Sequence, residues 1–233
     1  MTRILSIIVP CYNEVRTIAP LLQAVQEAPG LRKEVIVIDD FSTDGSREKL
    51  QTELGHLYDR LILQERNLGK GAAVRAGIAQ ASGDYLVVQD ADLEYDPNEY
   101  SKLLQPLIAE KADVVYGSRF LGGESRRVLY FWHSVGNRLV TLCCNVFSDL
   151  NLSDMETCYK IFNTRILKSI ELTEDRFGFD PEVTLKVARV TAIRFYEVGI
   201  SYSGRTYSEG KKISWKDGVR VLYCILKYGL FRR

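Results

Sequence analysis

The chain has 233 residues, of which 46% are hydrophobic and 26% charged, and its formal net charge is +1 at pH 7. This balance is typical of globular proteins, and the length suits one large α/β domain. A net charge so close to zero provides no overall field to attract nucleic acid, so we expect no nucleic-acid partner. No uninterrupted apolar run approaches the ~20 residues that span a bilayer, so contact with a membrane is expected to be peripheral.

The cysteines have no metal-site spacing, and two of them are adjacent. They are Cys11, Cys143, Cys144, Cys158 and Cys224. The first residues also lack the pattern of a secretory signal. We therefore expect reduced thiols and a cytoplasmic protein, located at the cytoplasmic face of a membrane if it acts on lipid.

Apolar strands alternate with helical segments through the first half of the chain. The expected strands are residues 4–9, 34–38, 61–64, 85–89 and 114–116. The expected helices are residues 17–27, a segment beginning near residue 46, residues 71–81 and residues 97–110. This alternation predicts the fold class α/β, with a Rossmann-like, mostly parallel sheet and helices on both faces, in a single domain.

The second half is less regular. It contains an apolar helix at 129–150 that Gly136-Asn137-Arg138 interrupts, a strand at 157–162, a helix at 179–190, a strand at 193–202 and a polar loop at 204–212. We expect one domain over residues 1–212. Residues 213–233 are expected to form an amphipathic helix that either belongs to this domain or contacts a membrane surface.

Polar residues follow each of the five strands predicted in the first half. These clusters are residues 10–14, 39–40, 67–71, 90–92 and 117–119. Ligands of parallel sheets bind beyond the carboxyl ends of the strands. The clusters therefore predict one binding site at that edge of the sheet.

Three carboxylates stand at alternate positions after the fourth strand: Asp90, Asp92 and Glu94. In an extended segment alternate residues face the same side, so these like charges would repel one another. A cation removes that repulsion, and Mg²⁺ and Mn²⁺ prefer such oxygen ligands. The pattern predicts a site for Mn²⁺ or Mg²⁺, and the alternative is that all three carboxylates are solvated at a strand end.

Two common phosphate-binding motifs are missing from the sequence. No G-x-G-x-x-G follows the first strand, and Gly69-Lys70-Gly71 lacks the Ser or Thr that completes a P-loop. A nucleoside would then be recognised by other groups, such as a carboxylate on the ribose. Asp39, at the end of the second strand, is well placed for that contact.

Four motifs carry a resemblance to a known family. They are IVPCYNE at 8–14, IDDFSTDG at 38–45, GKG at 69–71 and DAD at 90–92. In this order they resemble the metal-dependent, inverting family 2 glycosyltransferases with the GT-A fold, and more narrowly the dolichyl- and polyprenyl-phosphate mannose or glucose synthases. The resemblance is dense over residues 3–120 and looser to about residue 212.

The resemblance implies roles for the clustered residues. The nucleotide-sugar site would contain Pro10, Tyr12, Glu14, Asp39, Asp40, Lys70, Asp90 and Ala91. The metal on the donor diphosphate would be held by Asp90 and Asp92, with Glu94. The alternative for Pro10 is an ordinary turn, and for Tyr12 a packed aromatic ring.

Two departures bear on the choice of sugar. Mannose synthases of this type often carry Gln where Glu94 stands, and residues 154–162 look closer to the glucosyl-type relatives. GDP-mannose is therefore only slightly preferred to UDP-glucose as the expected donor.

The expected acceptor follows from charge. Transfer to a hydroxyl needs a general base, whereas a lipid phosphate is already anionic and needs cations that offset its repulsion from the donor. The expected catalytic residues are Asp92, Arg119, Arg138, Arg205 and Lys211. Two alternatives stay open: transfer to a saccharide hydroxyl with Asp180 or Asp154 as base, and a catalytically silent binding subunit.

The last helix predicts how a chain without a membrane span reaches a lipid. At 100° per residue one face carries Trp215, Val219, Leu222, Tyr223, Leu226 and Leu230. A basic stripe along its flank contains Lys216, Arg220 and Lys227. This mixture is typical of helices that lie in a membrane interface. The alternatives are a helix that only covers the core, and a partner subunit that brings the enzyme to its membrane.

Overall fold

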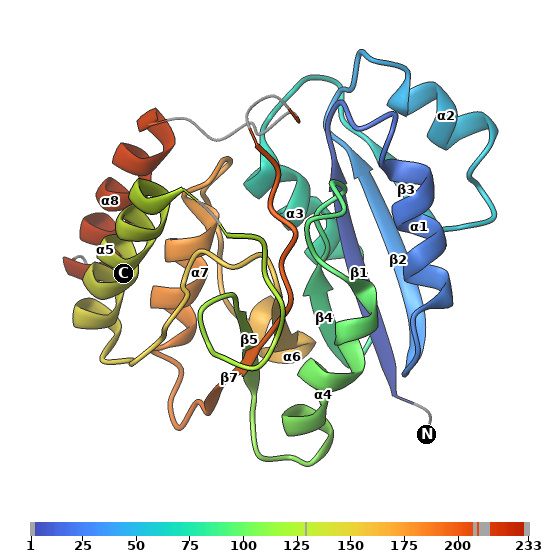
Figure 1. Ribbon diagram of the computed structural model, residues 1–233. Coiled ribbons are helices and arrows are strands. Elements are labelled where there is room, and N and C mark those ends of the chain that lie inside the picture. Colours follow the sequence, from blue (N-terminus) through green and yellow to red (C-terminus); the bar gives the residue numbers. More distant parts are fainter. Residues whose placement is uncertain (1–2, 129, 207–208, 210–214, 231–233) are drawn as a thin grey trace.

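The computed structural model of the protein describes residues 3–128, 130–206, 209 and 215–230 (Figure 1). Its sheet has seven strands in the order β3-β2-β1-β4-β6-β5-β7. The strands are β1 (Ile4–Cys11), β2 (Arg32–Asp39), β3 (Arg60–Leu63), β4 (Tyr85–Val88), β5 (Val114–Ser118), β6 (Lys160–Asn163) and β7 (Phe195–Gly199). Strand β6 runs antiparallel to both β4 and β5, and the other neighbouring pairs are parallel. The predicted α/β class with a mostly parallel sheet is confirmed.

Helices cover both faces of the sheet. They are α1 (Ile18–Glu27), α2 (Ser46–Thr52), α3 (Lys70–Gln80), the 3₁₀ turn η1 (Pro97–Glu99), α4 (Tyr100–Ile108), α5 (Phe131–Ser148), α6 (Thr164–Lys168), α7 (Phe179–Val187) and α8 (Trp215–Leu230). Helix α1 packs with η1, and α3 packs with α6; the two pairs lie on opposite faces (Figure 1). Helices α5, α7 and α8 pack together at the β5–β7 side of the molecule.

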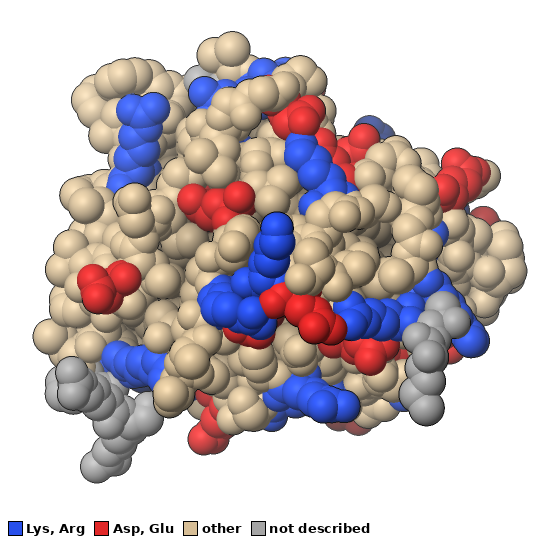
Figure 2. Space-filling model, turned by 90° about the horizontal axis from the view of Figure 1, so that it is seen from below, with Lys and Arg blue, Asp and Glu red and all other residues tan. Residues whose placement is uncertain are grey.

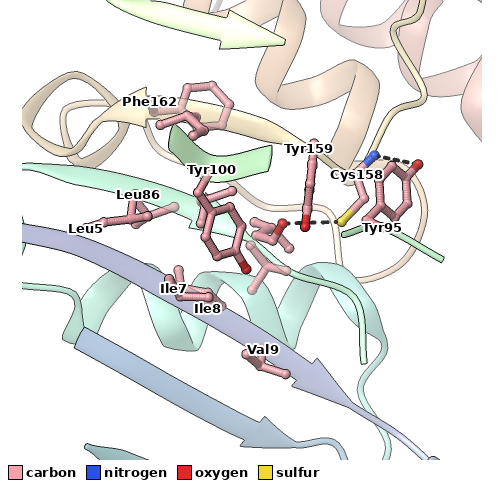
Figure 3. Close-up of a cluster of buried hydrophobic side chains, with 14 of the residues drawn as sticks. Leu5, Ile7, Ile8, Val9, Leu86, Tyr95, Tyr100, Cys158, Tyr159 and Phe162 are labelled. Carbon is pink, nitrogen blue, oxygen red and sulfur yellow. Dashed lines mark hydrogen bonds between the residues drawn. The ribbon is translucent and has the colours of Figure 1, made fainter. Parts of the chain in front are cut away.

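The central strands are buried because their residues are almost all apolar. The side chains of Leu5, Ile7, Ile8 and Val9 pack beside Leu86 of β4 in the interior (Figure 3). The core also holds the tyrosines Tyr95, Tyr100 and Tyr159. Each finds a partner for its hydroxyl: Tyr100 and Tyr159 donate to Gln89, and Tyr95 accepts from the Cys158 amide at 3.1 Å. These bonds fix the segment that follows β4 against the segment that precedes β6.

Several expected element boundaries differ in the structure. The apolar helix predicted at 129–150 is not interrupted, and the chain stays helical over Phe131–Ser148. Gly136 lies on its open side, where a Cβ would have no atom of another segment within 4 Å. The strand predicted at 157–162 begins only at Lys160, and the short helix α6 that follows was not predicted. All five cysteines are free thiols.

The last helix has two different faces. Val221, Cys224, Ile225 and Tyr228 are buried against α5 and α7 in a small second core. Leu222, Tyr223 and Leu226 lie on the exposed face predicted from the sequence. The side chains of Trp215 and Lys216 lie outside the described part of the chain. Among the described helices, none combines the length and the apolar character needed to cross a membrane.

The expected basic stripe on α8 is not a set of free charges. Arg220 and Lys227 both contact Glu174, at 2.7 Å and 3.1 Å, and the Tyr228 hydroxyl donates to the same carboxylate at 2.8 Å. Glu174 is buried, so these contacts tie α8 to the loop that precedes α7. Removing the charge of Arg220 or Lys227 would therefore weaken the contact between α8 and Glu174 as well as change the surface charge of the helix.

Charges of both signs are mixed on the molecule seen from the amino-terminal edge of the sheet (Figure 2). A cavity at this edge is lined by Arg3, Glu110, Asp113 and Arg194. Arg3 pairs with Glu110 at 3.0 Å, and Arg194 pairs with Asp113 at 2.8 Å. This edge therefore offers compensated ion pairs rather than a patch of one charge.

Candidate active site

A cavity of about 530 Å³ opens at the carboxyl ends of the central strands. All five polar clusters of the sequence contribute to its lining. The expected site residues among them are Pro10, Tyr12, Glu14, Asp40, Lys70, Asp90, Ala91, Asp92, Glu94, Arg119 and Arg205. The fold thus brings together expected site residues that are up to 195 positions apart, from Pro10 to Arg205.

The loop after β1 is held in place by polar residues of the segment that follows β2. The Asn13 amide donates to the Ser42 hydroxyl at 2.9 Å, and the Glu14 amide donates to the Ser46 hydroxyl at 2.8 Å. Asn13 adopts a positive φ of 52°, which Asn tolerates better than most residues. The turn exposes Tyr12 at the mouth of the cavity and directs Glu14 toward its interior.

The two aspartates at the end of β2 have different surroundings. Asp39 is fully buried, accepts from Arg47 Nε at 2.6 Å and does not line the cavity. Its Oδ1 is shielded from solvent and has no hydrogen-bond partner among the described residues. Asp40 accepts from the backbone amides of Leu68 and Gly69, each at 2.8 Å. Asp40 therefore fixes the loop that leads into α3.

Lys70 begins α3 and points at the end of β4. Its Nζ lies 2.6 Å from Asp90 Oδ1. Burial alone would lower the pKa of Lys70, but Asp90, together with Cys158 and Asp180, outweighs burial and raises it. Burial would likewise raise the pKa of Asp90, but Lys70, together with Cys158 and Lys160, outweighs burial and lowers that pKa. Asp90 and Lys70 are thus a charged pair at the floor of the cavity.

Gly69 allows α3 to start close to the chain segment before α7. It has a φ of 102°, and a Cβ at this position would lie 2.6 Å from the carbonyl oxygen of Asp175. The Ala72 amide donates to that same carbonyl at 3.0 Å. A side chain at residue 69 would push apart two segments that both border the cavity, which explains the glycine.

The three alternate carboxylates after β4 do not share one role. Both oxygens of Glu94 accept hydrogen bonds from the segment after β7: Oε2 from the Tyr202 hydroxyl at 2.6 Å and Oε1 from the Arg205 amide at 2.8 Å. Asp92 faces the Arg205 guanidinium, with Oδ2 3.0 Å from Nη2. Burial, together with Asp90 and Glu94, raises the pKa of Asp92 to about 7. A cation bound at Asp92 would therefore relieve the repulsion between the carboxylates of Asp92, Asp90 and Glu94.

These residues fit a divalent cation of the expected kind. In the described part of the chain, no three Asp, Glu, His or Cys side chains are already grouped as a complete ligand set. Mg²⁺, however, is usually held by only one or two carboxylates together with water and substrate phosphates. Asp92 and Asp90 both line the cavity and supply such oxygens. Glu94 is less suited, since both of its oxygens are engaged.

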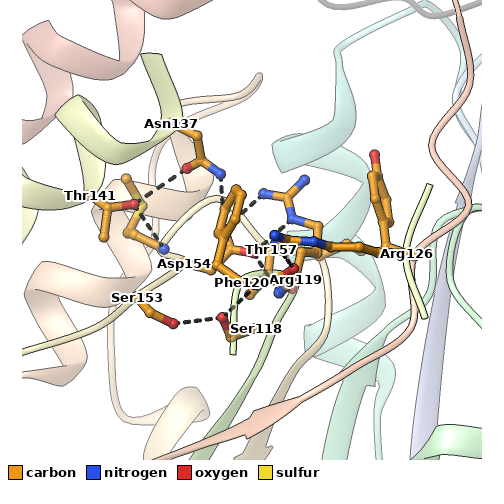
Figure 4. A network of polar contacts seen from close by, with 12 residues as sticks. Ser118, Arg119, Phe120, Arg126, Asn137, Thr141, Ser153, Asp154 and Thr157 are labelled. Atoms are coloured by element: carbon orange, nitrogen blue, oxygen red, sulfur yellow. Dashed lines mark hydrogen bonds and ion pairs between the residues drawn. The ribbon is translucent and has the colours of Figure 1, made fainter. Parts of the chain in front are cut away.

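Arg119 borders the cavity in a fixed orientation (Figure 4). Its Nε and Nη2 donate to the two oxygens of Asp154 at 2.7 Å and 2.8 Å. Asn137 of α5 donates to Asp154 at 3.1 Å. Burial would raise the pKa of Asp154, but Arg119 outweighs burial and lowers it. Asp154 is thus a poor proton acceptor, and its role is to orient Arg119.

Of the other two expected cations, Arg138 lies away from the cavity and Lys211 lies outside the described residues. Arg138 is exposed on α5 and does not line the cavity, whereas its neighbour Asn137 contacts Asp154. Arg205 does line the cavity, where it contacts Glu14 and Asp92 at 3.1 Å and 3.0 Å.

The cavity also contains residues that sequence reasoning did not assign to it. Among them are Glu156, Cys158, Arg176, Phe177, Tyr202 and Asp217. Asp154, Glu156 and Cys158 stand at alternate positions, as the carboxylates after β4 do, and this pattern is the signal that could have revealed Glu156. Asp180, considered as a base, lines the cavity but forms an ion pair with Lys160.

Residues 6–170 match the family model described as glycosyl transferase family 2. The chain belongs to glycosyltransferase family 2. The resemblance found in its motifs is therefore confirmed.

Two curated relatives illustrate the family. The dolichol-phosphate mannosyltransferase of Pyrococcus furiosus is 28% identical over 229 residues, which cover 96% of this chain and 64% of the relative. The dodecaprenyl-phosphate galacturonate synthase of Rhizobium johnstonii is 27% identical over 212 residues, covering 89% and 61%. The chain thus spans about three-fifths of the length of these relatives.

The fold also matches solved structures. The glucosyl-3-phosphoglycerate synthase of Mycobacterium tuberculosis, solved with Mn²⁺, UDP and glucosyl-3-phosphoglycerate, superimposes with a TM-score of 0.73. The match covers 99% of this chain and 81% of that one, at 19% sequence identity. At this identity the likeness concerns the fold alone, and it confirms the predicted GT-A architecture.

Proposed function

We propose that this family 2 glycosyltransferase moves a hexose from a nucleotide sugar to a polyprenyl or dolichyl phosphate, with inversion and with Mn²⁺ or Mg²⁺. The observation that carries the proposal is the division of charge in one cavity. Asp90 and Asp92 provide oxygens suited to a metal–diphosphate, and Arg119 and Arg205 provide cations suited to an acceptor phosphate. The relatives named as dolichol-phosphate and dodecaprenyl-phosphate sugar transferases support this acceptor class.

The donor is assigned to the β1–β4 side of the cavity. Pro10, Tyr12 and Glu14 would border the nucleoside, supported by their position after β1. Asp40 would act by holding the loop that carries Lys70. Asp39 would stabilise the nucleoside side through Arg47 rather than by direct contact. GDP-mannose stays slightly preferred to UDP-glucose, on the resemblance alone.

The diphosphate is assigned to the end of β4. A bound Mn²⁺ or Mg²⁺, held by Asp92 and Asp90, would stabilise the negative charge that develops on the leaving diphosphate. Lys70 keeps Asp90 ionised and therefore ready to accept a cation. Glu94 would act through the segment that it anchors, because it fixes Tyr202 and the backbone of Arg205.

The acceptor assignment is supported by the pairing of the candidate bases. Asp154 is bound by Arg119 and Asp180 by Lys160, so neither is a free carboxylate that could take a proton from a hydroxyl. A phosphate acceptor needs no such base, and Arg119, whose orientation Asp154 fixes, would offer that phosphate a positive charge. Arg205 and, by resemblance, Lys211 would complete the cationic side.

The proposed lipid acceptor implies contact with a membrane. Helices α5 and α8 pack side by side and expose a joint apolar face. Its residues are Phe131, Trp132, Leu139, Leu142, Val146, Val219, Leu222, Tyr223, Leu226 and Leu230. Asp217 of α8 lines the cavity, so the first turn of α8 adjoins the site. We assign it to a membrane surface, at the cytoplasmic face as expected from the sequence, with a partner subunit as the alternative.

The proposal is tested by incubating the protein with radiolabelled GDP-mannose or UDP-glucose, Mn²⁺ and polyprenyl phosphate in detergent. Label should pass into the organic phase as a lipid-linked sugar, and EDTA should abolish the transfer. Label on an added saccharide, with polyprenyl phosphate inert, would show a hydroxyl acceptor. Donor binding without transfer to either acceptor would show a silent binding subunit.

A further inference from the structure

Two carboxyl groups line the cavity on its β5–β6 side, Glu156 and Asp180, and Glu156 has no partner among the described residues. Asp180 is bound by Lys160, and Asp154, which does not line the cavity, is bound by Arg119. Glu156 takes part in no ion pair or hydrogen bond with the described residues. Its Oε1 is shielded from solvent, while the side chain as a whole borders the cavity.

An unpartnered buried carboxyl group destabilises a fold by about 1–3 kcal/mol, so its presence calls for an explanation. Burial and the nearby Asp180 raise the pKa of Glu156 to about 7, against the opposing effect of Lys160 and Arg119. Near neutral pH such a group is present partly as the acid, which both donates and accepts hydrogen bonds. That property matches a ligand hydroxyl, whereas a phosphate would be repelled by the ionised form.

The sheet order places Glu156 beyond the proposed diphosphate position. The sheet runs from β2 and β1, at the proposed nucleoside side, through β4 to β6 and β5. Asp90 and Asp92 follow β4, and Glu156 lies in the segment before β6. A donor whose diphosphate lies at the end of β4 therefore directs its hexose toward the β6 side, where Glu156 borders the cavity.

We propose that Glu156 hydrogen-bonds a hydroxyl of the transferred hexose and so helps to select the donor sugar. This inference rests on the proposed function, because it requires a nucleotide-sugar donor. Asp154 and Asp180 do not take this role, since their oxygens are held by Arg119 and Lys160. Glu156 is accordingly a specificity-determining residue and takes no proton in the reaction.

The test measures binding of a sugar donor and of its sugar-free counterpart. Calorimetry with Mn²⁺ compares GDP-mannose with GDP, and UDP-glucose with UDP, on the wild type, Glu156→Gln and Glu156→Ala. Glu171→Gln serves as control, because Glu171 is exposed and does not line the cavity. The Glu156→Ala substitution should weaken binding of the preferred nucleotide sugar about 10- to 100-fold, as expected for a lost hydrogen bond to a strongly polar group. Binding of the matching nucleoside diphosphate should stay unchanged.

Two further readouts separate this role from a structural one. A donor lacking the recognised hydroxyl, found by comparing deoxy-hexose analogues, should bind wild type and Glu156→Ala equally. The melting temperature of Glu156→Gln should equal or exceed that of the wild type, because the substitution removes an unpartnered acid. A lower melting temperature, with equal weakening for nucleotide and nucleotide sugar, would show a structural role and overturn the inference.

Other outcomes also decide the matter. Unchanged binding of the nucleotide sugar by both Glu156 variants would overturn the sugar contact while leaving the proposed function intact. A fall in turnover with a saccharide acceptor, at unchanged donor affinity, would make Glu156 a general base instead. Failure of the wild type to bind any nucleotide sugar would refute the proposed function, and the inference with it.

Discussion

Arg205 places its Nη2 3.0 Å from Oδ2 of Asp92, although the two residues are 113 positions apart in the sequence. The same guanidinium lies 3.1 Å from Glu14, and its backbone amide is held by Glu94. A cation supplied by the chain itself thus stands beside the carboxylate proposed to bind the metal. Metal binding at Asp92 is therefore expected to compete with Arg205, which would be released toward the acceptor side of the cavity.

This competition predicts that Arg205→Gln binds Mn²⁺ about tenfold more tightly than the wild type, because the ion no longer displaces a guanidinium. Mn²⁺ affinity is measured by electron paramagnetic resonance titration without donor or acceptor. Transfer to polyprenyl phosphate should fall in the same variant. Arg127→Gln is the matched control, since Arg127 pairs with Glu209 and does not line the cavity. Equal Mn²⁺ affinity in wild type and Arg205→Gln would show that Arg205 and the metal do not compete.

The metal assignment itself predicts the effect of Asp92→Asn. This change keeps the shape of the side chain but removes the charge that holds the cation, so transfer should fall about 100-fold or more. Mn²⁺ binding should weaken in parallel, while circular dichroism and the melting temperature should show an intact fold. Asp96→Asn is the control, because Asp96 is an exposed residue that caps η1. An Asp92→Asn enzyme with wild-type Mn²⁺ affinity would refute the assignment.

The sequence predicted where the site lies better than which residue of each cluster faces it. Apolar strands followed by polar residues located the correct edge of the sheet. The orientation of Asp39, however, depends on Arg47, which reaches it from α2. Arg138 and Asn137 differ by one position on α5, and the packing of that helix turns Asn137 inward. Local patterns carry no information about such contacts, because they are set by packing between distant elements.

Glu94 and Glu156 also show that an alternating pattern of acidic residues does not predict which carboxylates have partners. Glu94 shares an alternating pattern with Asp90 and Asp92, but residues from beyond β7 engage both of its oxygens. Glu156 stands in a similar pattern with Asp154, directly before the strand predicted at 157–162. The structure sets Glu156 apart because Arg119 binds Asp154 and Lys160 binds Asp180, whereas Oε1 of Glu156 has no hydrogen-bond partner among the described residues. The fold class was accessible from periodicity, whereas the partner of each charge was not.

The attachment of α8 predicts a dependence of stability on pH through Glu174. Burial would raise the pKa of this carboxyl, but hydrogen bonds from Arg220, Tyr228 and Lys227 outweigh it and lower the pKa to about 2. In the unfolded chain a glutamate titrates near ~4.3. The stabilisation is therefore complete above that pH and is lost as the pH falls toward 2.

Glu174→Gln should accordingly lower the free energy of unfolding by about 1.5–3 kcal/mol at pH 6, the range for hydrogen bonds to a charged group. This corresponds to a fall in melting temperature of about 2–4 °C per kcal/mol for a chain of this size. The difference from the wild type should shrink below pH ~4.3. Glu171→Gln, three residues earlier and exposed, should change neither value. A pH-independent difference would show that the charge of Glu174 is not what stabilises α8.

The joint apolar face of α5 and α8 predicts binding to lipid vesicles. Trp132 is 78% exposed and Leu226 is 51% exposed, which is unusual for side chains of this size in a cluster. An aromatic and aliphatic face of this kind is typical of helices that lie in the membrane interface. A fully buried side chain of either type contributes about 1.5–3 kcal/mol. The double substitution Trp132→Ser and Leu226→Ser should therefore weaken vesicle binding at least tenfold in a sedimentation assay.

A control variant distinguishes loss of the apolar face from a general effect of replacing exposed apolar side chains. Leu63→Ser with Ile108→Ser removes two exposed apolar side chains elsewhere, on β3 and at the end of α4, and should leave sedimentation unchanged. Arg220 and Lys227 are kept intact, since both hold Glu174. Vesicles with anionic lipid should bind the wild type more strongly than neutral ones. If the wild type ignores vesicles but elutes from gel filtration as a dimer, and Trp132→Ser with Leu226→Ser elutes as a monomer, the face joins two copies of the chain. A partner subunit would then have to bring the enzyme to its lipid.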